Sequence, residues 1–214
     1  MPKDKKHTIQ NAFKAKYFAS YDRLIKAELL KHNCSYCYYG HTHIPRSGDF
    51  FTNIGSYKDG HMVETGDYII INDLHLGLYP YSSEELQKIK RILESTKKVT
   101  ILGDFFDLFY DDPGEIKKEF EDFISIIKKR IKAGTLVYIR GNHDWAVKKH
   151  FDINARNFYV DGLILFIHGH TCDPLMSIFP LNVFYNTRMR LGHHMRHTKR
   201  IFSYLEKRFL APNK

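Results

Sequence analysis

The sequence is poor in the features that mark membrane, secreted and disordered proteins. Its 214 residues include only three cysteines, which cannot all pair with one another, so we expect a reducing, cytoplasmic setting. No apolar run approaches the roughly 20 residues that a membrane-spanning helix needs. The first residues, MPKDKKHTIQNAF, have no apolar core, so we expect no secretory signal there. The hydrophobic content of 43% can close a sizeable core, which excludes disorder as a description of the whole chain.

Positive charge and histidine are what the sequence has in excess. The formal net charge is +9, which favours anionic partners such as phosphates, nucleic acid or an anionic membrane surface, although a basic surface can also serve solubility alone. The thirteen histidines stand mostly in short patterns with Asp, Asn or Gly. Such patterns suggest metal chemistry.

Apolar spacing predicts alternating strands and helices. The strands are predicted at 34–39, 50–57, 61–72 (with a buried YIII at 68–71), 99–102, 135–139, and in a hairpin of 158–160 with 163–167. The helices are predicted at 10–32, 82–95, 113–132 and from 173 to about 210. No repeat or linker interrupts the pattern, so we expect one layered α/β domain over residues 1–214.

Polar residues that can bind metals follow five of the predicted strands. They form the clusters Gly40-His41-Thr42-His43, Asp73-Leu74-His75, Gly103-Asp104-Phe105-Phe106-Asp107, Gly141-Asn142-His143-Asp144 and His168-Gly169-His170. Ligands of open α/β sheets bind at the carboxyl ends of the strands. One such cluster alone would indicate a turn or a helix cap. Five of them, each after an apolar strand, predict a site at one edge of the sheet.

A zinc site made of Cys34, Cys37, His41 and His43 is the competing metal interpretation. Its spacing does not fit, because a structural zinc finger has a long gap between the cysteine pair and the histidine pair, and about three to five residues between its histidines. We therefore expect both cysteines to act as small buried hydrophobic residues.

Taken together, the five clusters resemble the motifs of the calcineurin-like metallophosphoesterases: D-x-H, GD-x-x-D, GNH[DE], an isolated His and GH-x-H. The resemblance covers roughly residues 17–170 and implies a four-layer αββα sandwich. The order differs, because GHTH comes last in the family and first here. We interpret this as a circular permutation in which residues 1–66 are the family's C-terminal part. Residues 67–170 would then hold the metal-binding core, and 171–214 a helical insert or cap.

The resemblance also implies two divalent metal ions bridged by Asp104. The first ion would be held by Asp73, His75, Asp104 and His43. The second would be held by Asp104, Asn142, His168 and His41. Mixed nitrogen and oxygen ligands suit Mn²⁺ first, with Fe or Zn²⁺ as alternatives. A hydroxide between the ions would attack phosphorus in line.

Four further residues receive roles in this interpretation. His143 would stabilise the developing charge or protonate the leaving oxygen, with Asp144 orienting it. Asp107 is expected to support the ligands rather than to bind metal. His170 is open between contacting the substrate and supporting a ligand.

A basic, aromatic-rich segment at 180–209 contains Arg188, Arg190 and Arg196. It is interpreted either as a solvated basic face or as a cap that binds an anionic substrate or anionic lipid. Its place after His168 is similar to the helical insertion of the UDP-2,3-diacylglucosamine hydrolases. That branch carries Arg where this chain has His143.

The function predicted is hydrolysis of a phosphomonoester or phosphodiester, on a phosphorylated small molecule, a nucleotide or a lipid-linked substrate. Peripheral membrane contact and a homodimer are left open. The alternatives are a UDP-2,3-diacylglucosamine-type pyrophosphate hydrolase, a non-catalytic metal-binding scaffold of the same fold and, least favoured, a nucleic-acid-binding module with salt-dependent affinity.

Overall fold

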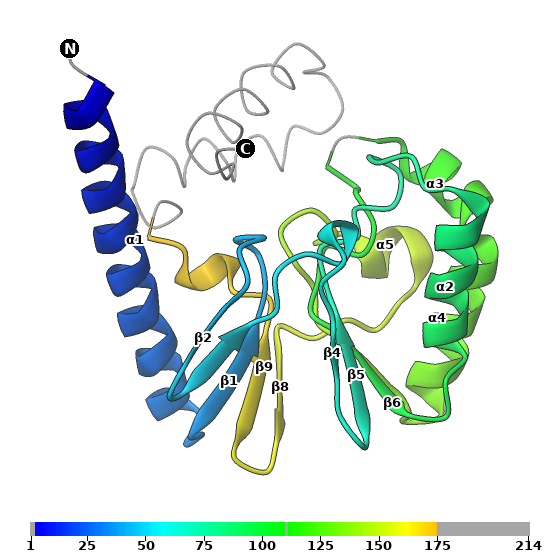
Figure 1. The fold of residues 1–214 in the computed structure, drawn as a ribbon. Helices are drawn as coiled ribbons and strands as arrows, with labels where there is room; N and C mark the ends of the chain where they lie inside the picture. The colour runs from blue at the N-terminus through cyan, green and yellow to red at the C-terminus, as the bar shows by residue number, and fades with distance from the viewer. Residues whose placement is uncertain (1–2, 110, 175–214) are drawn as a thin grey trace.

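The computed structural model describes residues 3–109 and 111–174, which fold into four layers (Figure 1). A long helix, α1 (Lys3–Lys31), lies on a five-stranded sheet with the order β2-β3-β1-β9-β8. A four-stranded sheet with the order β4-β5-β6-β7 follows, and the remaining α-helices cover its outer face (Figure 1). The expected α/β/β/α sandwich is therefore the architecture of the described residues.

The strands of the first sheet are β1 (Tyr36–Tyr39), β2 (Arg46–Gly48), β3 (Phe51–Asn53), β8 (Phe158–Asp161) and β9 (Ile164–Ile167). Those of the second are β4 (Val63–Glu64), β5 (Tyr68–Ile71), β6 (Lys98–Ile101) and β7 (Leu136–Tyr138). The other helices are α2 (Ser83–Leu93), α3 (Pro113–Glu119), α4 (Glu121–Lys132) and α5 (Val147–Phe151), with short 3₁₀ turns η1 (Tyr57–Asp59) and η2 (His170–Cys172).

Strand direction determines where the motifs emerge. Strands β5, β6 and β7 run parallel to one another, and β1 runs parallel to both β3 and β9. The chain therefore leaves β5, β6 and β7 at one edge of the second sheet, and β1 and β9 at one edge of the first. Parallel strands need both faces covered, which the two sheets and the flanking helices provide.

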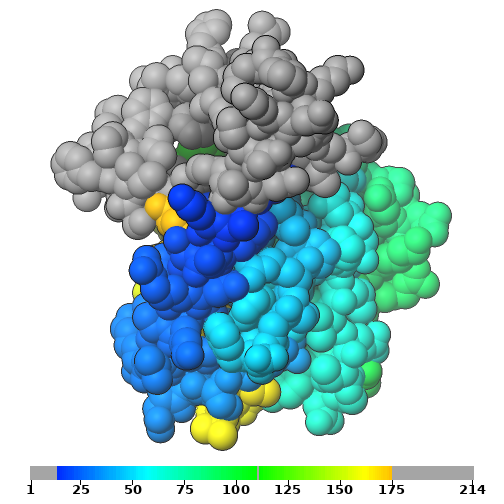
Figure 2. All heavy atoms as spheres, turned by 60° about the vertical axis from the view of Figure 1, so that its left-hand side comes forward, coloured from blue at the N-terminus to red at the C-terminus, as the bar shows by residue number. Residues whose placement is uncertain are grey.

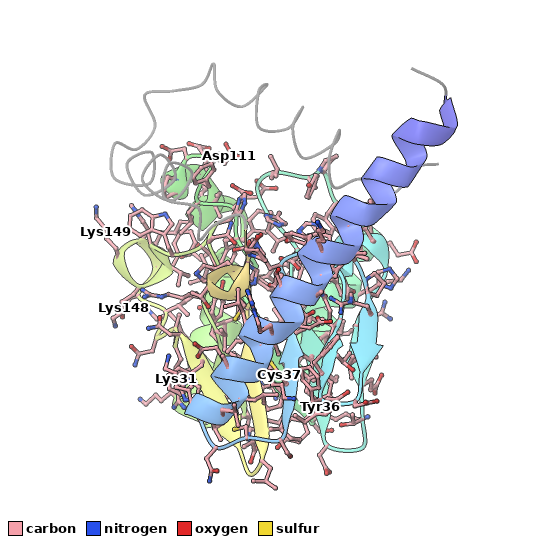
Figure 3. The ribbon with its side chains drawn as sticks, turned by 90° about the vertical axis from the view of Figure 1, so that its left-hand side faces the viewer. Lys31, Tyr36, Cys37, Asp111, Lys148 and Lys149 are labelled. Carbon is pink, nitrogen blue, oxygen red and sulfur yellow. The ribbon has the colours of Figure 1, made fainter. Side chains whose placement is uncertain are left out.

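Three apolar clusters hold the layers together. The first lies between α1 and the first sheet and includes Tyr21 and Ile25. The second lies between the sheets and includes Ile70 and Phe166. The third joins the second sheet to its helices. Seen from the α1 side, the helix crosses in front of the sheet that carries Cys37 (Figure 3).

The cysteine expectation is confirmed for one of the two residues. Cys37 is buried, whereas Cys34 is partly exposed at the end of α1, and both are free thiols. No group of metal-binding side chains in the described part of the chain includes a cysteine.

Residues 14–66 belong to the same body as the rest of the described chain. In the space-filling view the blue and cyan segments form one continuous face (Figure 2). Strand β1 pairs with β9, and β4 pairs antiparallel with β5. These pairings bring the segment after β1 to the edge where β9 ends. None of the helices in the described ranges is both long and apolar enough to cross a bilayer.

The structure differs from the predicted elements at several places. The strand predicted at 50–57 ends at Asn53, because Gly55 turns the chain with a φ of 74° and Ser56 caps η1. The segment 61–72 is a hairpin of two strands rather than one strand. The helix predicted at 113–132 breaks at Phe120, whose ring is buried against Phe123. Strand β2 and helix α5 were not predicted, and the expected helices after residue 174 lie outside the described residues.

Candidate metal centre

Five strand ends deliver the predicted side chains to one place. Strand β5 leads into Asp73 and His75, β6 into Asp104, β7 into Asn142, β9 into His168, and β1 into His41 and His43. Backbone bonds tie the ends together: the Asp73 N–H donates to the Gly103 carbonyl at 3.1 Å, and the Gly40 N–H to the His168 carbonyl at 2.9 Å. The motifs are thus held by the sheets and not by long loops.

One group of candidate ligand atoms surrounds Asp73. Its Oδ1 lies 3.6 Å from His43 Nε2 and 4.0 Å from His75 Nε2. His75 Nε2 lies 4.0 Å from Asp104 Oδ2 as well. Ligand bonds to a transition metal are about 2.0–2.2 Å long, so two ligands of one ion lie at most about 4.4 Å apart. These atoms are close enough to share one ion.

A second group lies on the other side of Asp104. Its Oδ2 is 3.3 Å from His168 Nε2, and that nitrogen is 3.0 Å from Asn142 Oδ1. The Asp104 carboxylate therefore lies between the His75 group and the His168 group. A carboxylate in this position can bridge two cations.

Asp73 Oδ1 and His75 Nε2 are among the buried side-chain atoms of the described residues that have no hydrogen-bond partner. The other polar atom of each side chain is held. Asp73 Oδ2 accepts from the His41 N–H at 3.0 Å, and His75 Nδ1 lies 3.0 Å from Asp107 Oδ2. A buried polar atom without a partner costs about 1–3 kcal/mol. A divalent cation would provide the missing partner of both atoms, so the residues present fit a metal ion.

Burial and neighbouring charges shift the pKa values of the cluster, and the shifts of its histidines suit metal binding. Burial, reinforced by the charge of Asp104, raises the pKa of Asp73 well above its usual range. Burial alone would raise the pKa of Asp104 too, but His168 and His143 hold it well below its usual value. Burial lowers the pKa of His43 to about 3 and also lowers that of His168. Rings with lowered pKa values are neutral at pH 7, which is the form that binds metals.

Backbone strain is concentrated in the motifs. Among the described residues, seven non-glycine residues have a positive φ, and five of them belong to the clusters: His41, His43, Asp73, His75 and Asp104. Residues held in this region cost about 1–3 kcal/mol each and gather at functional sites. Glycines allow the close approach around them. A Cβ at Gly141 would overlap the carboxylate of Asp104, and one at Gly40 would overlap the side chain of Asn72.

Comparison with known proteins agrees with this geometry. A family model described as calcineurin-like phosphoesterase matches residues 67–210. The chain belongs to the calcineurin-like phosphoesterase family. The matched region contains Asp73, Asp104, Asn142 and His168, whereas the GHTH segment precedes it. No curated protein and no solved structure matches the chain. The family and the His/Asp cluster together indicate a metal-dependent phosphoesterase.

In this phosphoesterase the role expected for Asp144 needs correction. The Asp144 carboxylate accepts from the Gly141 N–H at 2.6 Å, the Phe105 N–H at 3.0 Å and the Tyr138 hydroxyl at 2.6 Å. These bonds direct the Asp144 carboxylate into the interior, where it holds the loop with Gly141 against the loop with Phe105. Asp107 is the residue that contacts His143, with 2.8 Å between Asp107 Oδ2 and His143 Nδ1.

Asp107 thereby supports two rings with one carboxylate oxygen, because the same Oδ2 lies 3.0 Å from His75 Nδ1. Burial would raise its pKa, but the His143 and His75 rings hold it well below the usual value. A supporting role was expected for Asp107. Its contact with His143 was not, because the two residues lie 36 positions apart in the sequence.

Two histidines of the phosphoesterase motifs stand apart from the groups described above. His41 Nε2 lies 2.9 Å from Asp173 Oδ2, and its ring centroid is 5.2 Å from that of His168. His170 Nδ1 is buried without a partner, and the His170 ring lies 5.3 Å from His168. Nothing in the sequence pointed to Asp173. Arg188, Arg190 and Arg196 lie outside the described residues, so their substrate-binding role stays a prediction.

Proposed function

We propose that the protein is a dinuclear metal-dependent phosphoesterase that hydrolyses a phosphomonoester or a phosphodiester. The observation that carries this proposal is the pair of buried, unpartnered atoms Asp73 Oδ1 and His75 Nε2. They lie beside the Asp104 carboxylate, which also faces His168. Membership of the calcineurin-like phosphoesterase family supplies the reaction class.

In this proposal the first ion is held by Asp73, His75, Asp104 and His43, and the second by Asp104, Asn142, His168 and His41. The nitrogen and oxygen ligands suit Mn²⁺ first, with Fe and Zn²⁺ as alternatives. When bound, two such ions activate water at neutral pH and stabilise the charge that develops on the phosphoryl oxygens.

The chain's own residues fix the geometry and move the proton. Asp104 is held because its Oδ1 accepts from the His143 N–H at 2.7 Å. The His143 ring is anchored through Nδ1 by Asp107. Its other nitrogen, Nε2, is then the group that donates a proton to the leaving oxygen or a hydrogen bond to the phosphoryl group.

The proposal includes the circular permutation. The family match begins at residue 67, and His43, from the segment before it, lies 3.6 Å from Asp73 of the same chain. A rearranged chain that starts at residue 67 and carries residues 1–66 after residue 214, through a flexible linker, should bind the same metal ions. A rearranged chain that folds but binds none would contradict the permutation.

The experiment that tests the function combines metal content with activity. Purified protein supplied with Mn²⁺ should hold close to two ions per chain and cleave a chromogenic phosphodiester or phosphomonoester. Asp104→Ala should lose both ions, because its carboxylate is shared. His143→Ala should keep both ions and lose on the order of 10²–10⁴ in rate, as expected for a missing general acid.

Asp152→Ala is the matched control, since Asp152 is an exposed carboxylate that pairs with Lys148. It should keep both metal content and rate. Full metal occupancy in Asp104→Ala would refute the bridging role. Two bound ions with no turnover of any phosphoester would favour the non-catalytic scaffold instead.

A further inference from the structure

Two of the candidate ligand histidines are held in the same way. His75 Nδ1 lies 3.0 Å from Asp107 Oδ2, and His168 Nδ1 lies 2.7 Å from the carbonyl oxygen of Leu102. The other nitrogen of each ring, Nε2, faces Asp104 Oδ2, at 4.0 Å and 3.3 Å respectively. Metal-binding histidines are almost always oriented by an acceptor on the second ring nitrogen.

The His41 ring is held through Nε2 instead of Nδ1. Its Nε2 lies 2.9 Å from Asp173 Oδ2, and the two side chains are only 13% and 9% exposed. Its backbone N–H donates to Asp73 Oδ2 at 3.0 Å, which keeps the residue at the edge where the strands end. Because Nε2 is occupied by a carboxylate, Nδ1 is the nitrogen left for a metal ion.

Asp173 is itself held in place by its own segment and by α1. Its backbone N–H donates to the His170 carbonyl at 3.3 Å, at the end of η2. The buried Tyr17 of α1 is close enough to Asp173 that, after burial, the Asp173 charge further raises the pKa of the Tyr17 hydroxyl. One turn further along α1, the Tyr21 hydroxyl donates to the Gly169 carbonyl at 2.6 Å. Helix α1 is thus tied to the segment that carries Asp173.

We propose that Asp173 is a positioning residue that fixes His41 through Nε2, so that Nδ1 can bind the second metal ion. The inference rests on the proposed function, because it requires a second ion. Through the Tyr21–Gly169 hydrogen bond, α1 supports the segment that carries Asp173. Loss of such a supporting carboxylate lowers metal affinity by about 10–100-fold.

The test measures Mn²⁺ binding to the full chain by equilibrium dialysis, with metal content checked by elemental analysis. The wild-type chain should bind two ions. Asp173→Ala should retain the first and bind the second about 10–100-fold more weakly. Asp173→Asn should restore much of the affinity, because its side-chain oxygen can still accept from Nε2–H. Electron paramagnetic resonance should show coupled Mn²⁺ ions in the wild type and uncoupled ions in Asp173→Ala.

Asp22→Ala is the control for the docking of α1. It removes the ion pair between Asp22 of α1 and Arg46, whose atoms are 2.6 Å apart, without touching His41, and it should keep both ions. An equal loss of the second ion in Asp22→Ala would overturn the inference, because loosening of α1 alone would then explain the effect.

The remaining outcomes separate the two proposals. Two ions bound with unchanged affinity in Asp173→Ala would overturn the positioning role and leave the proposed function standing. If Asp173→Ala does not fold, Asp173→Leu decides, since it keeps the bulk of the side chain without an acceptor oxygen. It should weaken binding of the second ion alone, and unchanged affinity would overturn the inference. A wild-type chain that binds fewer than two ions would refute the dinuclear function and this inference with it.

Discussion

Replacing Gly103 by alanine should open the contact between two strand ends and disturb the metal centre. Gly103 has a φ of +97°, and a Cβ there would lie 2.6 Å from the Gly141 backbone nitrogen, 2.7 Å from His168 Nδ1 and 2.8 Å from the Gly141 Cα. Ordinary van der Waals contact begins at 3.4 Å, so the neighbours would have to retreat by 0.8 Å. Two of the three atoms are backbone, so no side-chain rotation can relieve the overlap.

The loss of stability expected for Gly103→Ala has two parts that a control variant can separate. Alanine at a positive φ loses about 1 kcal/mol relative to glycine, and overpacking adds about 1–3 kcal/mol. Gly60 has a φ of +85° and nothing within 4 Å of its Cβ position, so Gly60→Ala should show only the first part. For a chain of this size each kcal/mol lowers the Tm by about 2–4 °C. Gly103→Ala should therefore melt clearly below Gly60→Ala.

Metal content provides the second measurement. Gly103 precedes Asp104, and the displaced His168 is a ligand candidate, so Gly103→Ala should bind fewer ions than the wild type in elemental analysis after dialysis. Gly60→Ala should bind the same number as the wild type. Equal melting temperatures and equal metal content in the two variants would refute the reasoning from close packing.

Two further predictions concern the sheets. The Asp161 carboxylate accepts hydrogen bonds from Tyr68 and, at 2.9 Å, from Lys98, and these bonds lower its pKa. Asp161→Asn should lower the free energy of unfolding by about 0.5–1 kcal/mol at pH 7, since the ion pair of Asp161 with Lys98 is partly exposed and screened. This stabilisation is present above the pKa of Asp161 in the unfolded chain, about 4, and is lost as the pH falls through its pKa in the folded chain. The difference in urea unfolding between the wild type and Asp161→Asn should therefore be smaller at pH 3 than at pH 7. An unchanged difference would contradict the assignment. Phe166→Ala should lower the free energy of unfolding by about 3–5 kcal/mol, because the Phe166 ring is 1% exposed between the sheets. Phe158→Ala, at a position 42% exposed, should lower it by under about 1 kcal/mol. Similar losses of stability in the two variants in denaturant unfolding would refute this packing.

The meeting of the motifs at one edge could be predicted from the sequence because strand direction settles it. Asp73, Asp104 and Asn142 each follow a buried strand, and parallel strands end at the same edge. The chain between the strands needs no special geometry for this result. His43 was predicted in the same way, since β1 also runs parallel to its neighbours.

The supporting contacts could not be predicted, because they depend on side-chain direction in tight turns. Asp144 follows His143 in sequence, which suggested that it orients that ring. In the turn its carboxylate faces inward and accepts from Gly141 and Phe105. The ring is held by Asp107, from the end of another strand. The pairing of His41 with Asp173 spans 132 positions, and no local pattern encodes it.

Helix ends that depend on local sequence could be predicted, and those that depend on tertiary packing could not. The start of α2 could be predicted, because Ser82 accepts from the Glu85 N–H and forms a capping box. The break after α3 could not, because Phe120 leaves the helical region where its ring packs against Phe106 and Phe123. Burial of one aromatic ring there outweighs the propensity of the surrounding residues to continue the helix.

Three energetic costs meet at the edge where the strands end, and together they distinguish a metal site from a cluster of polar turns. Five motif residues have a positive φ, Asp73 Oδ1 and His75 Nε2 are buried without partners, and the pKa of Asp73 is raised by burial and by the charge of Asp104. A polar turn would relieve the unpartnered atoms and the raised pKa by rotating a side chain or admitting water. A divalent cation offsets the unpaired atoms and the like charges at once, and it needs the strained backbone to bring its ligands together.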